Sequence, residues 1–177
     1  MRTNQNGMTL IEVLVALFVL VTGVLGAVAM QTTAKKGSFD ALQRSVASSL
    51  AQDIVERMRN NDADATILEG YEGTYGGSAA TEPTPACNSE ANACTPAQLR
   101  AYDIFEWTEL LRGADAKIGG NNAGGLINAL GCITHANQIV TVTIVWNGKV
   151  DSSDGGGGTC GTSSASRRKV ELTAYMF

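Results

Sequence analysis

The sequence predicts an α+β fold in which a long N-terminal helix packs on a small antiparallel sheet of about three strands. Two observations lead to this prediction. Residues 8–60 follow a helical pattern, which is almost wholly apolar over residues 8–30 and amphipathic over residues 31–60. The last third of the chain contains short β-branched segments of alternating character, separated by loops rich in glycine and serine.

The apolar half of the helix is long enough to span a membrane. Residues 8–30 contain only three polar side chains, those of Thr9, Glu12 and Thr22. As a helix this segment would extend roughly 34 Å, compared with a hydrocarbon core of about 30 Å. We therefore expect a membrane-spanning helix over residues 8–30, preceded by a short polar leader, residues 1–7, and followed by a head, residues 31–177.

Glu12 is the exception within this apolar segment. A carboxylate inside a membrane helix costs on the order of 3 kcal/mol and needs a partner. The sequence has no Lys, Arg or His between Thr3 and Ala34. If the chain were cut after Gly7, the new amino group on Met8 would lie one helical turn from Glu12, which makes it the candidate partner.

Small residues in the same helix indicate packing against other helices. Gly23 and Gly26 would each destabilise a helix in water by about 1 kcal/mol relative to alanine. In a membrane they allow a second helix to approach closely, and Gly23 and Ala27 form a small-xxx-small pair. We therefore assign helix packing to these three residues.

The amphipathic half is predicted to form one face of the head. Its apolar residues recur at steps of three or four: Phe39, Leu42, Val46, Leu50, Ile54 and Met58. Polar residues such as Gln43 fall between them and define a solvent-exposed face. We expect the apolar stripe to pack on the sheet and the helix to end at residues 60–62, where Asn and Asp follow two arginines.

Beyond this helix the prediction alternates between loops and one clear helix. Residues 61–94 are expected to be irregular, with one short helical turn near residues 64–68. Thr95 followed by Pro96 is typical of a helix start, and that helix is predicted to end at Gly113. The glycine-rich residues 119–125 lack the lysine and hydroxyl residue of a phosphate-binding loop, so we predict a turn there.

Three strands are predicted in the C-terminal part. The first covers residues 126–133 and the second residues 138–146, where four apolar residues alternate with a second set that includes Val145. A long loop follows, and residues 167–177 form the last strand.

The four cysteines, Cys87, Cys94, Cys132 and Cys160, all follow the membrane segment. An even number predicts two disulfides in an oxidising compartment, and this places the head outside the cell membrane. Three pairings are possible, of which we prefer Cys87 with Cys94 and Cys132 with Cys160. The rival interpretation is a zinc site formed by all four thiolates, which the absence of a C-x-x-C pair disfavours.

Composition and motifs argue against several other functions. The formal charge is −4 and no basic stripe occurs, so we expect no nucleic acid partner. His135 is the only histidine and is interpreted as a turn or strand-end residue. Asp151 and Asp154 lack the spacing of a calcium loop. We predict no enzyme activity, no metal and no cofactor.

The sequence GMTLIEVLVAL that begins at Gly7 resembles the N-terminal signal of type IV prepilins and pseudopilins. The resemblance implies that a prepilin peptidase cleaves between Gly7 and Met8, that the new amino group of Met8 is methylated, and that Glu12 functions in assembly. Residues 31–61, together with the helix around residues 102–111 and the last strands, resemble PilV-type minor pilins. The fold that this family implies is pilin-like.

This resemblance implies a minor subunit of the type IV pilus, or fimbrium, that primes pilus assembly and supports adhesin display at the tip. Its partners would be prepilin peptidase, other minor pilins, the major pilin and a tip adhesin. The protein would cross the inner membrane once, with its head in the periplasm, and reach the cell surface in the pilus. Twitching motility and cell adhesion would depend on it. The alternatives are a minor pseudopilin of a type II secretion system and a pilus-borne adhesin or DNA-uptake subunit.

Overall fold

The computed structural model describes residues 7–61, 64–88, 93–114, 116–151 and 158–176. The chain divides into two compact units, Met1–Phe39 and Asp40–Phe177. Helix α1 (Leu10–Asn60) contributes to both, so the predicted long helix is confirmed, with a start two residues later than expected. It ends where the Asn61 N–H donates to the carbonyls of Arg57 and Met58, as its run of polar residues predicts.

The second unit contains a four-stranded antiparallel sheet in the order β1-β4-β5-β6. Its strands are β1 (Gly73–Tyr75), β4 (Leu130–Ala136), β5 (Ile139–Asn147) and β6 (Arg167–Tyr175). A separate two-stranded ribbon pairs β2 (Lys117–Ile118) with β3 (Asn121–Asn122), where the sequence predicted only a turn. The α+β class with a long helix and a small antiparallel sheet is therefore confirmed.

Two shorter helices complete the second unit, and their ends follow local sequence signals. Helix α2 (Ala65–Glu69) is capped by the carboxylate of Asp64, and it confirms the predicted helical turn. Helix α3 (Pro96–Arg112) begins with a capping box, in which the Thr95 side chain accepts from the Gln98 N–H and the Gln98 side chain accepts from the Thr95 N–H. Gly113 ends α3 in the left-handed conformation, with φ of 66°.

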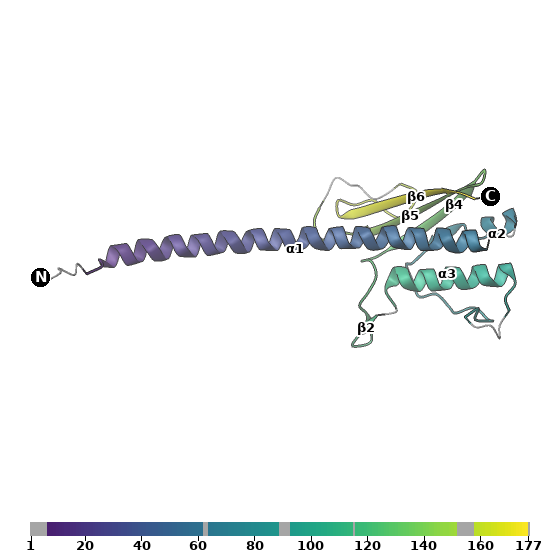
Figure 1. The fold of residues 1–177 in the computed structure, drawn as a ribbon, viewed down its shortest axis with the longest axis horizontal. Helices are drawn as coiled ribbons and strands as arrows, with labels where there is room; N and C mark the ends of the chain where they lie inside the picture. Colours follow the sequence, from purple (N-terminus) through teal and green to yellow (C-terminus); the bar gives the residue numbers. More distant parts are fainter. Residues whose placement is uncertain (1–6, 62–63, 89–92, 115, 152–157, 177) are drawn as a thin grey trace, which may run out of the picture. The chain divides into compact units, whose positions relative to one another are not determined.

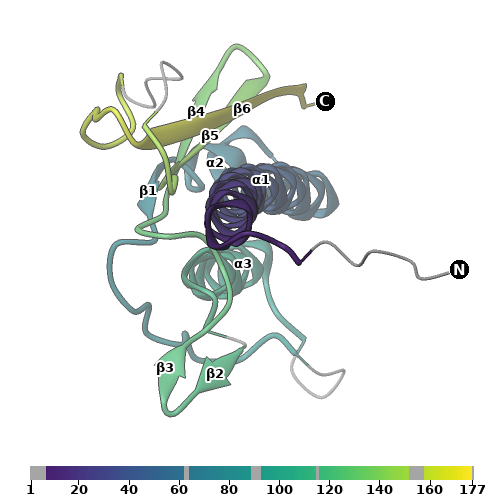
Figure 2. The same cartoon turned by 90° about the vertical axis from the view of Figure 1, so that its left-hand side faces the viewer.

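Within this unit, residues 40–60 of α1 lie between the sheet and α3 (Figures 1 and 2). The ribbon of β2 and β3 lies beyond α3, on the side away from the sheet (Figure 2). The core joins all three layers, and its largest fully buried side chains include Trp107, Trp146, Tyr71, Ile54 and Met58.

The central position of α1 corrects the predicted stripe of the amphipathic half. Leu42 was expected in the core but is 61% exposed, whereas Gln43 was placed on the solvent-exposed face and is 4% exposed. Because α1 is covered on two sides, its buried residues form a broader set that includes Ala47, Ala51 and Val55. The prediction assumed that only the sheet would cover the helix, and it therefore placed the buried face too narrowly.

The sheet differs from prediction in two places. Strand β1 lies in the segment that was expected to be irregular, and it exists because residues 73–75 pair with β4, Thr74 opposite Cys132. Strand β4 begins four residues later than predicted. Asn128 has φ of 49°, outside the strand region, and the Leu126 N–H donates to the carbonyl of Leu111 on α3 instead of to a neighbouring strand.

The outer face of the sheet contains a second, small apolar cluster. Val145 was predicted to face away from the core, and it does, yet it is fully buried. The disulfide between Cys132 and Cys160 holds the loop after β5 against this face, and the loop covers Val145 together with Leu130. Strand β5, one of the two inner strands, is therefore buried on both faces near its C-terminal end.

Candidate functional site

The junction between Gly7 and Met8 is exposed and precedes the first turn of α1. Residues 7–9 are not helical, and the Met8 side chain is 71% exposed. A peptide bond in accessible, non-helical backbone can enter a protease active site, whereas a bond inside a helix cannot do so without unfolding. Arg2 and the rest of the predicted leader before Gly7 lie outside the described residues.

Glu12 lies in the first turn of α1 and takes part in a cap that the sequence analysis missed. The Glu12 N–H points to Thr9, 3.1 Å from its carbonyl oxygen and 3.4 Å from its hydroxyl oxygen. Thr followed three residues later by Glu is the signature of a capping box, so this pair could have been found from the sequence. A carboxylate in the first turn is also stabilised by the helix dipole. No described residue forms an ion pair with Glu12.

The apolar segment of α1 has no partner within its own unit. All its large apolar side chains from Met8 to Met30 are exposed, with exposed fractions from 46% for Val21 to 80% for Leu10. By length and composition α1 is also the one candidate membrane span among the described residues. An apolar surface of this extent is typical of a segment that inserts into lipid or packs against other proteins.

The three small residues assigned to helix packing lie on this exposed surface. A methyl group built on Gly23 or Gly26 would meet no atom within 4 Å, and Ala27 is exposed. Their small size therefore serves no contact within the described chain. These small side chains leave room for a second helix to approach closely.

The four cysteines form the disulfides Cys87–Cys94 and Cys132–Cys160, which is the pairing preferred from the sequence. The zinc interpretation is therefore wrong for these thiols. Cys132–Cys160 ties the loop after β5 to the sheet, whereas Cys87–Cys94 closes a short loop before α3.

A polar network that sequence analysis did not find joins α1 to α3. Arg57 on α1 contacts three carboxylates, those of Asp53 (2.9 Å), Glu106 (2.6 Å) and Asp103 (3.3 Å). The Tyr71 hydroxyl donates to Asp103 at 2.7 Å. Burial raises the pKa of Asp103, although the Tyr71 and Arg57 hydrogen bonds oppose that rise. The network links the two helices, with Asp103 buried and the Asp53 and Glu106 carboxylates partly exposed at its edge.

The head shows no arrangement typical of catalysis or metal binding in its described part. No group of three or more His, Cys, Asp or Glu side chains among those residues is placed to hold a metal ion. His135 is the penultimate residue of β4, and its backbone N–H donates to Glu72 at 2.7 Å. Asp154, one of the two aspartates considered for calcium, lies outside the described residues.

Comparison with protein families gave two matches that adjoin in the sequence. Residues 2–28 match the prokaryotic N-terminal methylation motif, and residues 29–105 match the family of type IV pilin Tt1218. Neither the comparison with curated proteins nor that with solved structures gave a match. The first match covers the Gly7–Met8 junction, Glu12 and most of the exposed apolar helix. The second covers the amphipathic half of α1 and continues into α3.

The methylation motif implies processing by prepilin peptidase and assembly with other pilins, and the apolar helix fits anchoring in a membrane before assembly. The chain thus combines, in order, an N-terminal methylation motif and a Tt1218-like type IV pilin segment, which together support a pilin subunit.

Proposed function

We propose that this protein is a minor pilin of the type IV pilus that helps to prime pilus assembly. The single observation that supports this most strongly is the exposed apolar surface of residues 8–30, which contains one carboxylate in its first turn. Such a helix is stable in a membrane or in a bundle of like helices, and not in water. The head is the part that neighbouring subunits would contact outside the membrane.

In this proposal residues 1–7 are a leader, residues 8–30 a membrane and assembly helix, and residues 31–177 a periplasmic head. Prepilin peptidase cleaves between Gly7 and Met8, and Met8 is then methylated. The inner membrane holds the mature subunit until it joins the pilus. The exposed, non-helical backbone at residues 7–9 supports cleavage at this bond.

Glu12 would then direct docking. In the low dielectric of a helix bundle an unpaired carboxylate is costly, so a subunit in the wrong axial register is penalised. The new amino group on Met8 of a neighbouring subunit is the countercharge. Within one subunit, the same amino group lies about one turn from Glu12 and reduces the cost before assembly.

The cleavage proposal is tested with Gly7→Val, compared with Gly37→Val as a matched control. Gly37 is exposed on α1, away from the proposed cleavage bond, and a side chain built there meets no atom within 4 Å. In cells with active prepilin peptidase we expect the first variant to keep the mass of the full chain and the control to be shortened by seven residues, as measured by intact mass. A Gly7→Val protein of mature mass would refute cleavage at this bond.

The docking proposal is tested by comparing Glu12→Gln with Glu12→Ala. Glutamine can replace glutamate in a capping box, so the first variant removes the charge and leaves the cap available. If charge pairing directs assembly, both variants remain in the membrane and are depleted from sheared surface filaments. Wild-type amounts of Glu12→Gln in filaments would rule out the charge pairing, and selective loss of Glu12→Ala would assign Glu12 to the cap alone.

The minor role is tested by deletion and by the abundance of the protein in filaments. A priming subunit is scarce in purified pili, and its loss reduces the number of pili and twitching motility. Crosslinking in membranes should then capture other minor pilins, and a tip adhesin if the subunit is close to the tip. Normal pili with reduced release of secreted proteins would instead assign the chain to a type II secretion system.

A further inference from the structure

The head contains a buried arginine that no described carboxylate neutralises. Arg167, the first residue of β6, is 6% exposed. Its Nη1 donates to the carbonyl of Asn128 at 2.8 Å and to the side chain of Asn147 at 3.1 Å, and its Nε has no partner among the described residues. The adjacent Arg168 is also buried, but it is paired with Asp40 at 2.9 Å.

A buried cation normally pairs with an anion, because its transfer out of water is otherwise strongly unfavourable. Burial alone lowers the pKa of Arg167, which agrees with the lack of a described carboxylate nearby. The two acceptors that it does have are neutral. The guanidinium therefore keeps a positive charge for which the described residues supply no anion.

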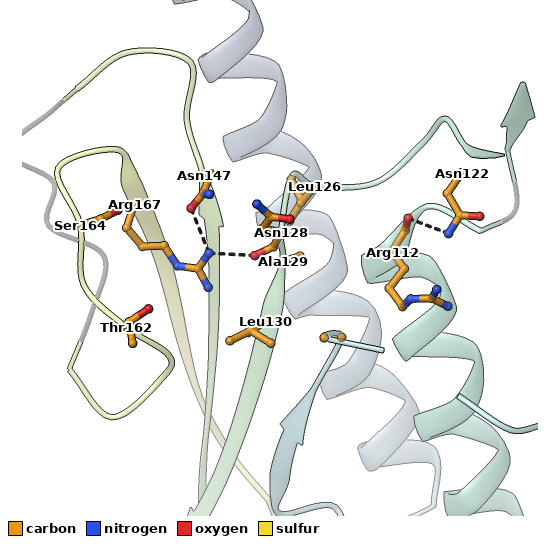
Figure 3. A pocket seen from close by; sticks show the side chains of 12 residues that line it. Arg112, Asn122, Leu126, Asn128, Ala129, Leu130, Asn147, Thr162, Ser164 and Arg167 are labelled. Carbon is orange, nitrogen blue, oxygen red and sulfur yellow. Dashed lines mark hydrogen bonds between the residues drawn. The ribbon is translucent and has the colours of Figure 1, made fainter. Parts of the chain in front are cut away.

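Arg167 lines a cavity of about 600 Å³, here called the polar pocket. Figure 3 shows Arg167 on one side, between Asn147 and Asn128, with Thr162 and Ser164 from the loop that precedes β6. Arg112 of α3 lies on the opposite side, but its charge is already paired with Glu109 at 2.6 Å. The lining thus combines one unneutralised guanidinium with side-chain amides and hydroxyls, and Leu126 and Leu130 add an apolar part.

The pocket's size and lining define the ligand. A bare ion would fill little of 600 Å³, and no aromatic residue lines the pocket for an apolar ring. Amide and hydroxyl groups pair with ligand hydroxyls, and a guanidinium pairs with a carboxylate or phosphate. We propose that the polar pocket binds a small acidic sugar, with its oxyanion on Arg167 and its hydroxyls on the amide and hydroxyl side chains around it.

The test uses the full chain in detergent and titrates three sugars by calorimetry. The probes are glucuronate, which carries a carboxylate, glucose 6-phosphate, which carries a phosphate, and neutral glucose. We expect at least one acid to bind about tenfold or more tightly than glucose, because a charge-assisted hydrogen bond distinguishes them. The tighter of the two acids identifies the oxyanion. Equal binding of glucose, or no binding of either acid, would overturn the proposal.

A matched pair of variants then locates the binding to the pocket. Thr162 is exposed, so Thr162→Glu and Thr162→Gln are expected to fold alike. The first adds a carboxylate to the pocket that Arg167 lines and should weaken acid binding about tenfold, whereas the second should change it less than about twofold. Equal affinities for the two variants would place any acid binding elsewhere and refute the assignment. The melting temperature of each variant confirms that the head is folded.

Discussion

Gly131 allows the indole of Trp107 to lie directly on strand β4, and Gly131→Ala is expected to destabilise the head. A methyl group at position 131 would overlap the Trp107 ring and lie 3.0 Å from Leu111 Cδ1. Neither side chain has space to retreat, because both are fully buried. The indole is also held by its Nε1–H, which donates to the Leu50 carbonyl of α1 at 2.8 Å.

The size of the effect follows from these contacts. Forcing a methyl group into a packed core costs about 1–3 kcal/mol, and the lower backbone entropy of alanine in the unfolded chain returns less than about 1 kcal/mol. We therefore expect Gly131→Ala to lower the free energy of unfolding by about 2 kcal/mol. Trp107→Phe should lower it by about 3 kcal/mol, because it removes both volume and the hydrogen bond to Leu50.

The double variant separates this mechanism from general damage. Phenylalanine leaves space for the new methyl group, so the double variant should be at least about 1 kcal/mol more stable than the sum of the single effects predicts. Urea unfolding of the full chain in detergent, followed by near-ultraviolet circular dichroism, reports the head because both tryptophans lie there. Gly37→Ala is the control, since its site is open. Effects that add within about 0.5 kcal/mol would refute the proposed overlap.

Three further predictions concern buried polar groups. Asp40→Ala removes the partner of the buried Arg168 and should cost about 3 kcal/mol in urea unfolding, whereas a loss under about 0.5 kcal/mol would show that the pair is not needed. Burial of Asp40 opposes a low pKa, but the hydrogen bond from the Lys149 N–H and the charge of Arg168 together lower the pKa of its carboxyl. The stability that Asp40 contributes is therefore complete above about pH 4 and is lost as the pH falls through the lowered pKa. Asp40→Asn should accordingly flatten the acid side of the profile of stability against pH. Tyr71→Phe removes the hydroxyl that donates to Asp103 and should cost about 1–3 kcal/mol at neutral pH, where an unchanged midpoint would contradict this.

Features determined by neighbouring residues could be predicted from the sequence. Helix α3 is the clearest case, because Thr95, Pro96 and Gln98 form its start and Gly113 its end within the local chain. The N-terminal methylation motif is also local, since Gly7, Met8 and Glu12 lie within six residues, and the roles given to these residues stay predictions. Helix propensity, capping and the apolar run act at this short range, so no tertiary information is required.

Features determined by distant contacts could not be predicted in this way. Strand β1 has only three residues and no readable alternation, and it becomes a strand through its pairing with β4. The hydrogen bond between Tyr71 and Asp103 joins residues 32 apart in the sequence. The neutral acceptors of Arg167 come from Asn128 and Asn147, which are also distant from it in the sequence. In the same way, Gln43 is buried although the helical pattern placed it on the polar face of α1.

The two halves of α1 show why the N-terminal part could be interpreted in terms of function. In residues 40–60 the buried positions are set by the sheet and α3, so the sequence pattern reflects packing within the chain. In residues 8–30 the apolar residues occupy every side of the helix, and no described residue covers them. A helix that is apolar on all sides needs a surrounding medium, and one carboxylate within it needs a specific partner. Because neither the medium nor the partner is present in the single chain, this pattern is evidence for an intermolecular function.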